Sequence, residues 1–237
     1  MGKNLIQQKR GKGSLTYRAP SFRYKAEVKH YNLESKGVIT DLVHCAGHSA
    51  PLMEVFYTTG DKHLTIAPDG VKVGDEVKVG ICESLTLNNG NVLALKNIPD
   101  GTLIHNIELR PGDGGKLVRT SGSFAKIVAK LEGSVKVKLP SNQEKLFSQE
   151  CKAAIGVIAG SGRLEKPFLK AGVRYKKMRA RNKLYPIVCG ISMNAVNHPF
   201  GGKCSHIKGR PTQCARSAPP GRKAGKIAPR RTGRKNR

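Results

Sequence analysis

The sequence has few acidic residues and no long apolar run. Its 237 residues include 16 Asp and Glu against 43 Lys and Arg, which gives a net charge of +27. No stretch of about 18 apolar residues is present to span a bilayer, and the N-terminus lacks the apolar core of a signal peptide. The basic segments also lack the stripe of large apolar residues that holds a helix on a membrane surface. These absences predict a cytoplasmic protein that binds no membrane.

Motifs of common enzyme active sites are missing as well. Neither Gly-x-Ser-x-Gly nor His-Glu-x-x-His occurs, and no pair of carboxylates stands at a recognisable spacing. Residues 110–117 (RPGDGGKL) resemble a phosphate-binding loop, but Arg110 takes the place of its first glycine and Leu117 the place of Ser or Thr. We therefore predict that the protein is not an enzyme and that these residues form a tight turn.

The basic residues that are present are concentrated at the two ends of the chain. Residues 1–30 carry eight basic residues and one acidic residue, and residues 163–237 carry 21 and one, whereas residues 31–162 carry 14 of each. A segment with so much charge of one sign repels itself, so its natural partner is a polyanion. This distribution predicts a neutral folded middle between two ends that bind RNA.

The N-terminal segment alternates basic residues with Gly, Ser and aromatic residues. Basic side chains neutralise phosphate, and rings such as Tyr17, Phe22 and Tyr31 can stack on bases. The segment has too few apolar residues to fold alone, so we expect an extended arm bound to RNA; the alternative is a tail whose rings pack on the domain that follows. The predicted phosphate-binding residues of both ends are Lys9, Arg10, Lys12, Arg18, Arg23, Arg222, Lys223, Arg230, Arg231, Arg234 and Lys235.

The neutral middle shows the apolar–polar alternation that is typical of short strands. Val135, Val137 and Leu139 alternate with lysines, and residues 71–79 place four valines on alternating positions around a Gly-Asp turn. Several short strands with turn signals and no long helical period indicate small β-barrels, so we predict an all-β fold. Beyond the middle, residues 169–181 are expected to form a short basic helix, and the last 40 or so residues cannot fold unaided.

Residues 190–203 (GISMNAVNHPFGGK) are not suited to a hydrophobic core. Short polar side chains can contact base edges and phosphates, and a histidine before a proline is pushed into extended backbone. Gly201 and Gly202 permit positive φ and let another chain approach the backbone closely. A plain surface loop is the alternative, and the charge on either side favours RNA. The residues that we expect to contact RNA here are Asn194, His198, Gly201, Gly202 and Lys203.

The six cysteines have scattered spacings that do not indicate a disulfide framework. Four Cys and His residues could supply the ligands of a zinc site, but their spacing is not a recurrent zinc-finger spacing, so packing or RNA contact is favoured over a metal. Those four candidates are Cys189, Cys204, His206 and Cys214. His44, Cys45 and His48 form a second cluster of this kind. Cys82 and Cys151 have strand-like flanks and are predicted to be small core residues.

Long motifs along nearly the whole chain resemble the L-two family of large ribosomal subunit proteins, in its archaeal and eukaryotic branch. The motifs are IAPDG at 66–70, GNVLALKNIPDGT at 90–102, RPGDGGKLVRTSGSFAKIVA at 110–129, AAIGVIAGSGRLEKP at 153–167, RARNKLYP at 179–186, GISMNAVNHPFGGK at 190–203 and APPGRKAGKIAPRRTGRK at 218–235. Because the motifs are long and collinear, the resemblance is specific.

The resemblance implies an OB-like barrel at residues 34–92 and an SH3-like barrel at 93–170, with basic extensions at 1–33 and 171–237. It implies that both extensions thread into ribosomal RNA near the peptidyl transferase region. Residues 193–194 and 198–202 match the family loop that enters this RNA, where RNA is the catalyst and the protein supplies supporting contacts. Implied partners are large-subunit RNA, other large-subunit proteins and a bridge to the small subunit. No cofactor is expected beyond Mg²⁺ held by the RNA.

Some positions depart from the family pattern. Cys189 stands where the family has Arg, Tyr185 replaces a Trp, and HCAGHSAP at 44–51 differs from HDPGRSAP. Each lost arginine is replaced by Cys or His, which keeps zinc open as a hypothesis. A free-standing zinc-dependent RNA-binding or regulatory factor is therefore the alternative function. A metal-dependent RNA-modifying enzyme is the third.

Overall fold

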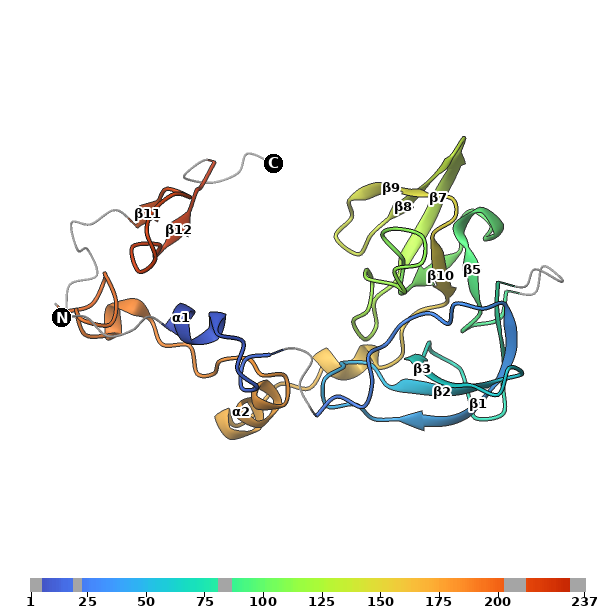
Figure 1. The fold of residues 1–237 in the computed structure, drawn as a ribbon, viewed down its shortest axis with the longest axis horizontal. Helices are drawn as coiled ribbons and strands as arrows, with labels where there is room; N and C mark the ends of the chain where they lie inside the picture. The colour runs from blue at the N-terminus through green and yellow to red at the C-terminus, as the bar shows by residue number, and fades with distance from the viewer. Residues whose placement is uncertain (1–5, 19–22, 81–86, 203–211, 231–237) are drawn as a thin grey trace. The chain divides into compact units, whose positions relative to one another are not determined.

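The computed structural model describes residues 6–18, 23–80, 87–202 and 212–230. The chain divides into two compact units (Figure 1). We call Phe22–Arg174 the sheet unit, and Met1–Ser21 together with Tyr175–Arg237 the tail unit. Among the described residues, no helix combines the length and the apolar character needed to cross a membrane.

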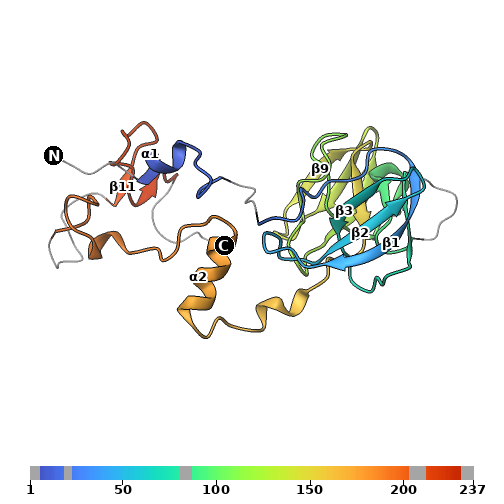
Figure 2. The same ribbon diagram turned by 60° about the horizontal axis from the view of Figure 1, so that its bottom comes forward.

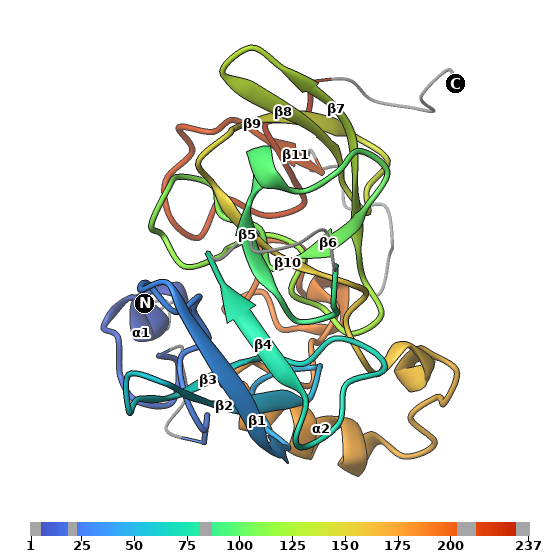
Figure 3. The ribbon, with the colours of Figure 1, turned by 90° about the vertical axis from the view of Figure 1, so that its right-hand side faces the viewer.

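Among its described residues, the sheet unit contains ten strands hydrogen-bonded in the order β3-β2-β1-β4-β5-β10-β6-β7-β8-β9. All neighbours in this order are antiparallel except β4 and β5, which meet in a parallel pair at Val79 and Val92. Figure 3 shows β4 between the β1 side and the β5 side of the unit. The strands are β1 (Ser35–Val43), β2 (Leu52–Tyr57), β3 (Lys62–Ile66), β4 (Glu76–Val79), β5 (Val92–Ala94), β6 (Leu103–His105), β7 (Ala125–Leu131), β8 (Ser134–Lys138), β9 (Glu144–Ser148) and β10 (Lys152–Ile155). The prediction of a fold built mainly from β-strands is confirmed.

The same bulged hairpin occurs on both sides of the β4–β5 junction. The register between β1 and β2, which lie side by side in Figure 2, shifts between Ile39 and Asp41. The register between β7 and β8 shifts between Ile127 and Ala129. A bulge adds a residue to one strand and increases its twist, so each hairpin curves over its own apolar face. The alternating burial along β1 and β8 follows from the alternating side chains seen in the sequence.

Three clusters of buried apolar residues form the core of the sheet unit. One gathers Ile39, Val55 and Tyr57 from the first hairpin, and a second gathers residues of β5–β10, including the buried thiol of Cys151. The third joins Val28 to Leu52 and Ile158. Each fully buried Ile, Leu or Val contributes about 1.5–3 kcal/mol relative to exposure. The prediction for Cys151 is confirmed, and Cys82 lies outside the described residues.

The alternating valines at residues 71–79 indicated strand on both sides of the Gly-Asp turn, and this prediction is wrong before the turn. The second half of the stretch forms β4, but residues 71–75 form no strand, and Val73 is 55% exposed. The Asp75 carboxylate accepts a hydrogen bond from the Lys72 N–H (2.9 Å), and the Gly74 N–H donates to the Ile39 carbonyl (2.8 Å). This side-chain turn directs the backbone to β1, so the first pair of valines has no strand partner.

Part of the N-terminal segment packs on the sheet unit, as the alternative hypothesis for its aromatic rings stated. Tyr31 stacks on Tyr57 at 4.2 Å between ring centres, and Tyr24 contacts His48 at 5.4 Å. Val28 is buried, and its carbonyl accepts a hydrogen bond from the Arg119 guanidinium (2.7 Å). An extended, RNA-bound arm is therefore the wrong description of this part of the segment, because protein already covers its apolar and aromatic side chains.

The part of the tail unit that the structure describes contains little regular structure. Its described elements are α1 (Ile6–Gly11), most of α2 (Ala171–Ala180) and the two-stranded parallel pair of β11 (Gln213–Cys214) with β12 (Lys226–Ile227). Three short 3₁₀ turns complete the elements of the described residues: Leu95–Asn97 and Ser161–Leu164 in the sheet unit and Gly190–Ser192 in the tail unit. The helix predicted at 169–181 is confirmed as α2, which buries no residue. The short helix α1 was not predicted.

The stability of the sheet unit is expected to depend on pH because two of its histidines are buried. The His30 imidazole donates from Nε2 to the Asn106 carbonyl (2.5 Å), and His105 donates from Nδ1 to the Gly156 carbonyl (3.0 Å). Burial lowers the pKa of each from 6.5 to about 4. Since the unfolded chain binds these protons more tightly, the stability that the neutral rings provide is complete above pH 6.5 and is lost as the pH falls toward 4. The loss is about 3 kcal/mol for each histidine.

We therefore expect the free energy of unfolding of the full chain, measured by urea denaturation between pH 7 and pH 4.5, to fall with pH. His30→Gln keeps an N–H donor near the Asn106 carbonyl but has no titrating ring, so its slope in this window should be shallower. His44→Gln, at an exposed position, is the matched control and should keep the original slope. An equal slope for all three proteins would show that the buried ring of His30 does not set this dependence.

Candidate RNA-binding surface

The larger part of each charged end belongs to the tail unit. The tail unit contains 22 Lys and Arg and no Asp or Glu, whereas the sheet unit contains 21 basic and 16 acidic residues. The cations of the tail unit therefore cannot form ion pairs with carboxylate side chains of the same unit. In the sheet unit such pairs do form, for example between Lys136 and Glu144 (2.6 Å). This separation makes the tail unit the candidate surface for phosphate.

Most of the predicted phosphate-binding side chains that the structure describes are exposed. The exposed ones are Lys9, Arg10, Lys12, Arg18, Arg222, Lys223 and Arg230. Arg23 is half-buried and belongs to the sheet unit. The Arg10 guanidinium lies 5.8 Å from the centre of the Tyr17 ring, a cation–π contact that holds both side chains beside each other. Arg231, Arg234 and Lys235 lie outside the described residues.

Asn182 joins the two ends of the chain, and the sequence analysis did not single it out. Its side-chain amide donates to the carbonyls of Leu15 (2.9 Å) and Arg18 (2.7 Å). Asn182 has φ 52° just after α2, and the Lys183 N–H returns to the Met178 carbonyl (2.9 Å). This is a helix C-cap of the kind that favours Gly or Asn, so an Asn just past a basic helical stretch was the available signal.

The loop at residues 190–202 closes on itself. It begins with the 3₁₀ turn Gly190–Ser192, and the N–H groups of Asn197 and His198 both donate to the Asn194 carbonyl (2.9 and 3.2 Å). The Gly202 N–H then donates to the Met193 carbonyl (3.3 Å) and completes the loop. The side chain of Asn194 is exposed at its surface. Lys203 lies outside the described residues.

Gly201 and Gly202 serve different purposes in this loop. A Cβ on Gly201 would lie 2.4 Å from the Asn194 carbonyl oxygen, so the close approach that Gly201 permits is made by the loop's own backbone. Gly202 has φ 109°, a conformation that side chains with a Cβ rarely adopt. A Cβ there would lie 3.1 Å from the Ala195 side chain. Both glycines are therefore needed to form the loop itself.

His198 is held in one orientation by its neighbours. Its ring packs against the backbone of Gly190, where a Cβ would lie 2.3 Å from the ring, and makes an edge contact with Phe200 at 5.0 Å. The Phe200 N–H donates to His198 Nδ1 (3.1 Å). Because Nδ1 accepts this hydrogen bond, the proton of the neutral ring is on Nε2. His198 is thus a hydrogen-bond donor at Nε2.

The candidate zinc ligands are only partly described. Cys189 is exposed and Cys214 lies on β11, while Cys204 and His206 fall outside the described residues. Within the described ranges, no three His, Cys, Asp or Glu side chains are grouped closely enough to hold a metal ion. In the second cluster Cys45 is buried and its thiol lies 3.0 Å from His48 Nδ1.

The sequence that resembles a phosphate loop forms a tight turn around two carboxylates. The Asp113 carboxylate accepts hydrogen bonds from the N–H groups of Leu109 (3.1 Å) and Arg110 (3.3 Å). The buried Glu108 carboxylate accepts from Gly112, Gly114 and Lys152. Two carboxylates at this position would repel a phosphate, and their backbone hydrogen bonds give them a structural role. The predicted turn is confirmed.

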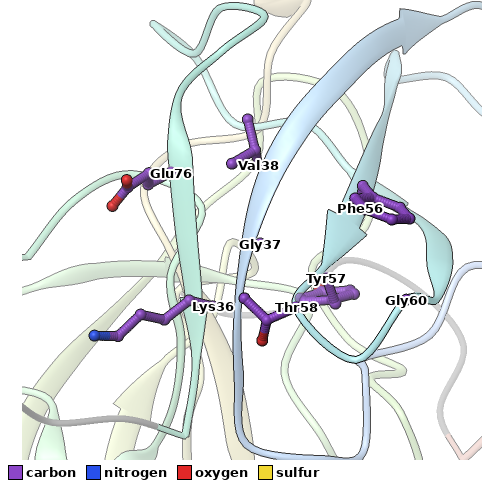
Figure 4. A pocket seen from close by; sticks show the side chains of 8 residues that line it. All are labelled: Lys36, Gly37, Val38, Phe56, Tyr57, Thr58, Gly60 and Glu76. Atoms are coloured by element: carbon purple, nitrogen blue, oxygen red, sulfur yellow. The ribbon is translucent and has the colours of Figure 1, made fainter.

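The sheet unit has a shallow groove of about 350 Å³ on the outer face of β1 and β2 (Figure 4). Val38 and Phe56 are its apolar walls, exposed by 42% and 44%. Lys36 and Glu76 line the same groove and carry opposite charges. This balance gives the groove no preference for a polyanion, in contrast to the tail unit.

Comparison with known proteins identifies the family. Residues 88–220 match the family described as "Ribosomal Proteins L2, C-terminal domain". The large ribosomal subunit protein uL2 of Natronomonas pharaonis is 46% identical over 99% of this chain and 97% of its own length. The uL2 proteins of Methanothermobacter thermautotrophicus (45%, 99% and 100%) and Halorubrum lacusprofundi (47%, 99% and 98%) are similarly close. The chain therefore belongs to the uL2 family of large ribosomal subunit proteins.

Proposed function

We propose that the chain is a structural component of the large ribosomal subunit, in which the sheet unit folds as protein and the tail unit binds large-subunit ribosomal RNA. The observation that carries this proposal is the separation of charge. All 22 cations of the tail unit stand without an acidic residue in the same unit. As a ribosomal component the chain works in the cytoplasm, and its role is structural rather than enzymatic.

For the sheet unit we propose an OB-like barrel at residues 34–92 followed by an SH3-like barrel at 93–170. Each side has its own bulged hairpin and its own apolar cluster, which supports two subdomains. The strong curvature that bulges give is what a small barrel needs to close. The basic extensions at 1–33 and 171–237 complete the division, although Val28 and His30 are buried within the sheet unit.

For the loop at 190–202 we propose supporting contacts to RNA near the peptidyl transferase region, made by Asn194, His198 and Lys203. Its self-closed backbone supports this role, because a preformed loop presents polar groups to RNA at little entropic cost. Neighbouring large-subunit proteins, a bridge to the small subunit and RNA-held Mg²⁺ are further partners in this proposal. Zinc at Cys189, Cys204, His206 and Cys214 stays a prediction that metal analysis of purified protein tests. Nothing favours a free-standing zinc-dependent factor over the ribosomal role.

Removing residues 215–237 is expected to flatten the salt dependence of RNA binding. Each neutralised phosphate releases counterions and adds about −0.7 to −0.9 to the slope of log K against log salt. The deleted segment carries nine Lys and Arg. The measurement is filter binding of the chain to large-subunit RNA at several salt concentrations. The control replaces the segment with Gly and Ser of equal length, and a slope that stays at the full-length value in both variants would rule out phosphate contacts by this segment.

Gly202→Val is expected to reduce incorporation of the tagged chain into large subunits although its charge is unchanged. A β-branched residue at φ 109° costs about 1–3 kcal/mol and opens the loop. Lys203→Ala should have the smaller effect, since it removes one phosphate contact among many.

Gly172→Ala is the matched control for this pair. Gly172 is in α2, has no positive φ and has no atom within 4 Å of an added Cβ. This variant should incorporate like the original chain. Normal incorporation of Gly202→Val together with poor incorporation of Lys203→Ala would show that this stretch contributes charge and not a preformed loop.

A further inference from the structure

A cavity of about 430 Å³ lies within the tail unit, where three separate segments of the chain meet. Its walls come from α1, from residues 184–199 and from residues 221–224. The volume falls in the range of about 300–1,000 Å³ that is typical of ligand-binding pockets. The apolar side chains of Ile187, Val188 and Val196 line it and are otherwise exposed by half or more. These side chains are therefore not part of a hydrophobic core. They form an exposed apolar wall that a bound molecule could cover.

The polar groups at this cavity are matched to an anion with hydrogen-bond acceptors. His198 lines it, and its Nε2 is a donor because Nδ1 already accepts from the Phe200 N–H (3.1 Å). Lys223 adds a flexible cation, and the whole unit has no acidic residue to compete for it. The occupant that fits must combine an apolar face, an acceptor and negative charge.

A nucleotide has all three properties. RNA is recognised in single-stranded regions by bases that leave the stack, pack on rings or apolar side chains and accept hydrogen bonds at their edges. An apolar side chain of a neighbouring protein would use the wall of this cavity but neither the imidazole donor nor the cation. The charge of the unit thus favours RNA over protein as the occupant.

We propose that this cavity holds one unstacked nucleotide of ribosomal RNA. The base packs on the Ile187–Val188 wall, the Nε2–H of His198 donates to an acceptor of the nucleotide, and Lys223 neutralises phosphate. This inference rests on the proposed function and adds a single-nucleotide site to it. It also assigns His198 the role of a donor that positions RNA, because Nδ1 accepts the Phe200 N–H and Nε2 is the nitrogen left to donate.

The test uses large subunits that contain tagged full-length variants. Ala224 lines the cavity, so Ala224→Leu fills part of it without a change of charge. His198→Ala removes the donor, whereas His198→Gln places an amide N–H where Nε2–H stands. Ala215→Leu makes the same substitution at an exposed position outside the cavity and is the matched control. The RNA of each subunit is probed with dimethyl sulfate and with a 2′-hydroxyl acylating reagent.

We expect one unpaired nucleotide to be protected in subunits with the original chain and with Ala215→Leu. Its reactivity should rise about tenfold with Ala224→Leu and His198→Ala, within the range set by losing one base-stacking contact. His198→Gln should restore most of the protection. A photo-crosslinking residue in place of Val188 should attach to the same nucleotide.

Other outcomes would contradict either the nucleotide site alone or the proposed function as well. If the variants are incorporated and no single nucleotide changes, or if reactivity rises throughout the RNA, the cavity is not a nucleotide site although the proposed function stands. A crosslink from position 188 to a ribosomal protein would show that a protein, and not RNA, occupies the cavity. If the original chain itself does not enter large subunits, the proposed function fails and not only this inference.

Discussion

Repulsion among the cations of the tail unit is the constraint on which the rest of the structure depends. With 22 basic residues and no acidic one, this unit cannot neutralise its own charge. It also buries no helix residue in α1 or α2, so it lacks the apolar area that would offset the entropy of ordering a chain, about 1–2 kcal/mol per residue. A polyanion provides both the missing negative charge and a surface on which the chain can become ordered. Ribosomal RNA is such a polyanion.

The sheet unit differs from the tail unit because it contains a buried apolar core and both signs of charge. Its buried polar groups hold loops in place: Glu108 accepts hydrogen bonds from three backbone N–H groups, and Arg119 binds the Val28 carbonyl. Buried polar groups are costly when unpaired, so these contacts determine where the N-terminal segment and the 108–115 turn lie.

The loop at 190–202 belongs to the basic tail unit, but its backbone is held in one shape by its own hydrogen bonds. Glycine is used there to let backbone pack on backbone within the loop, as the contact of Gly201 with Asn194 shows. The same packing orients His198 and fixes which of its nitrogens donates. A loop that is shaped by its own hydrogen bonds has its polar groups in position before any partner arrives, so less binding free energy is lost to ordering it.

The sequence by itself determined the class of partner, the β-rich middle, the helix near 169–181 and the family, because charge, alternation and long motifs are local properties of the chain. The OB-like and SH3-like division and the RNA contacts of single residues are still predictions. Tertiary structure alone decided that both ends share one unit, joined by Asn182 at Leu15 and Arg18, and that Tyr31 stacks on Tyr57. It also decided that residues 71–75 turn toward β1 instead of pairing with β4. Each of these depends on which distant segments pack together, and composition and periodicity contain no information about that choice.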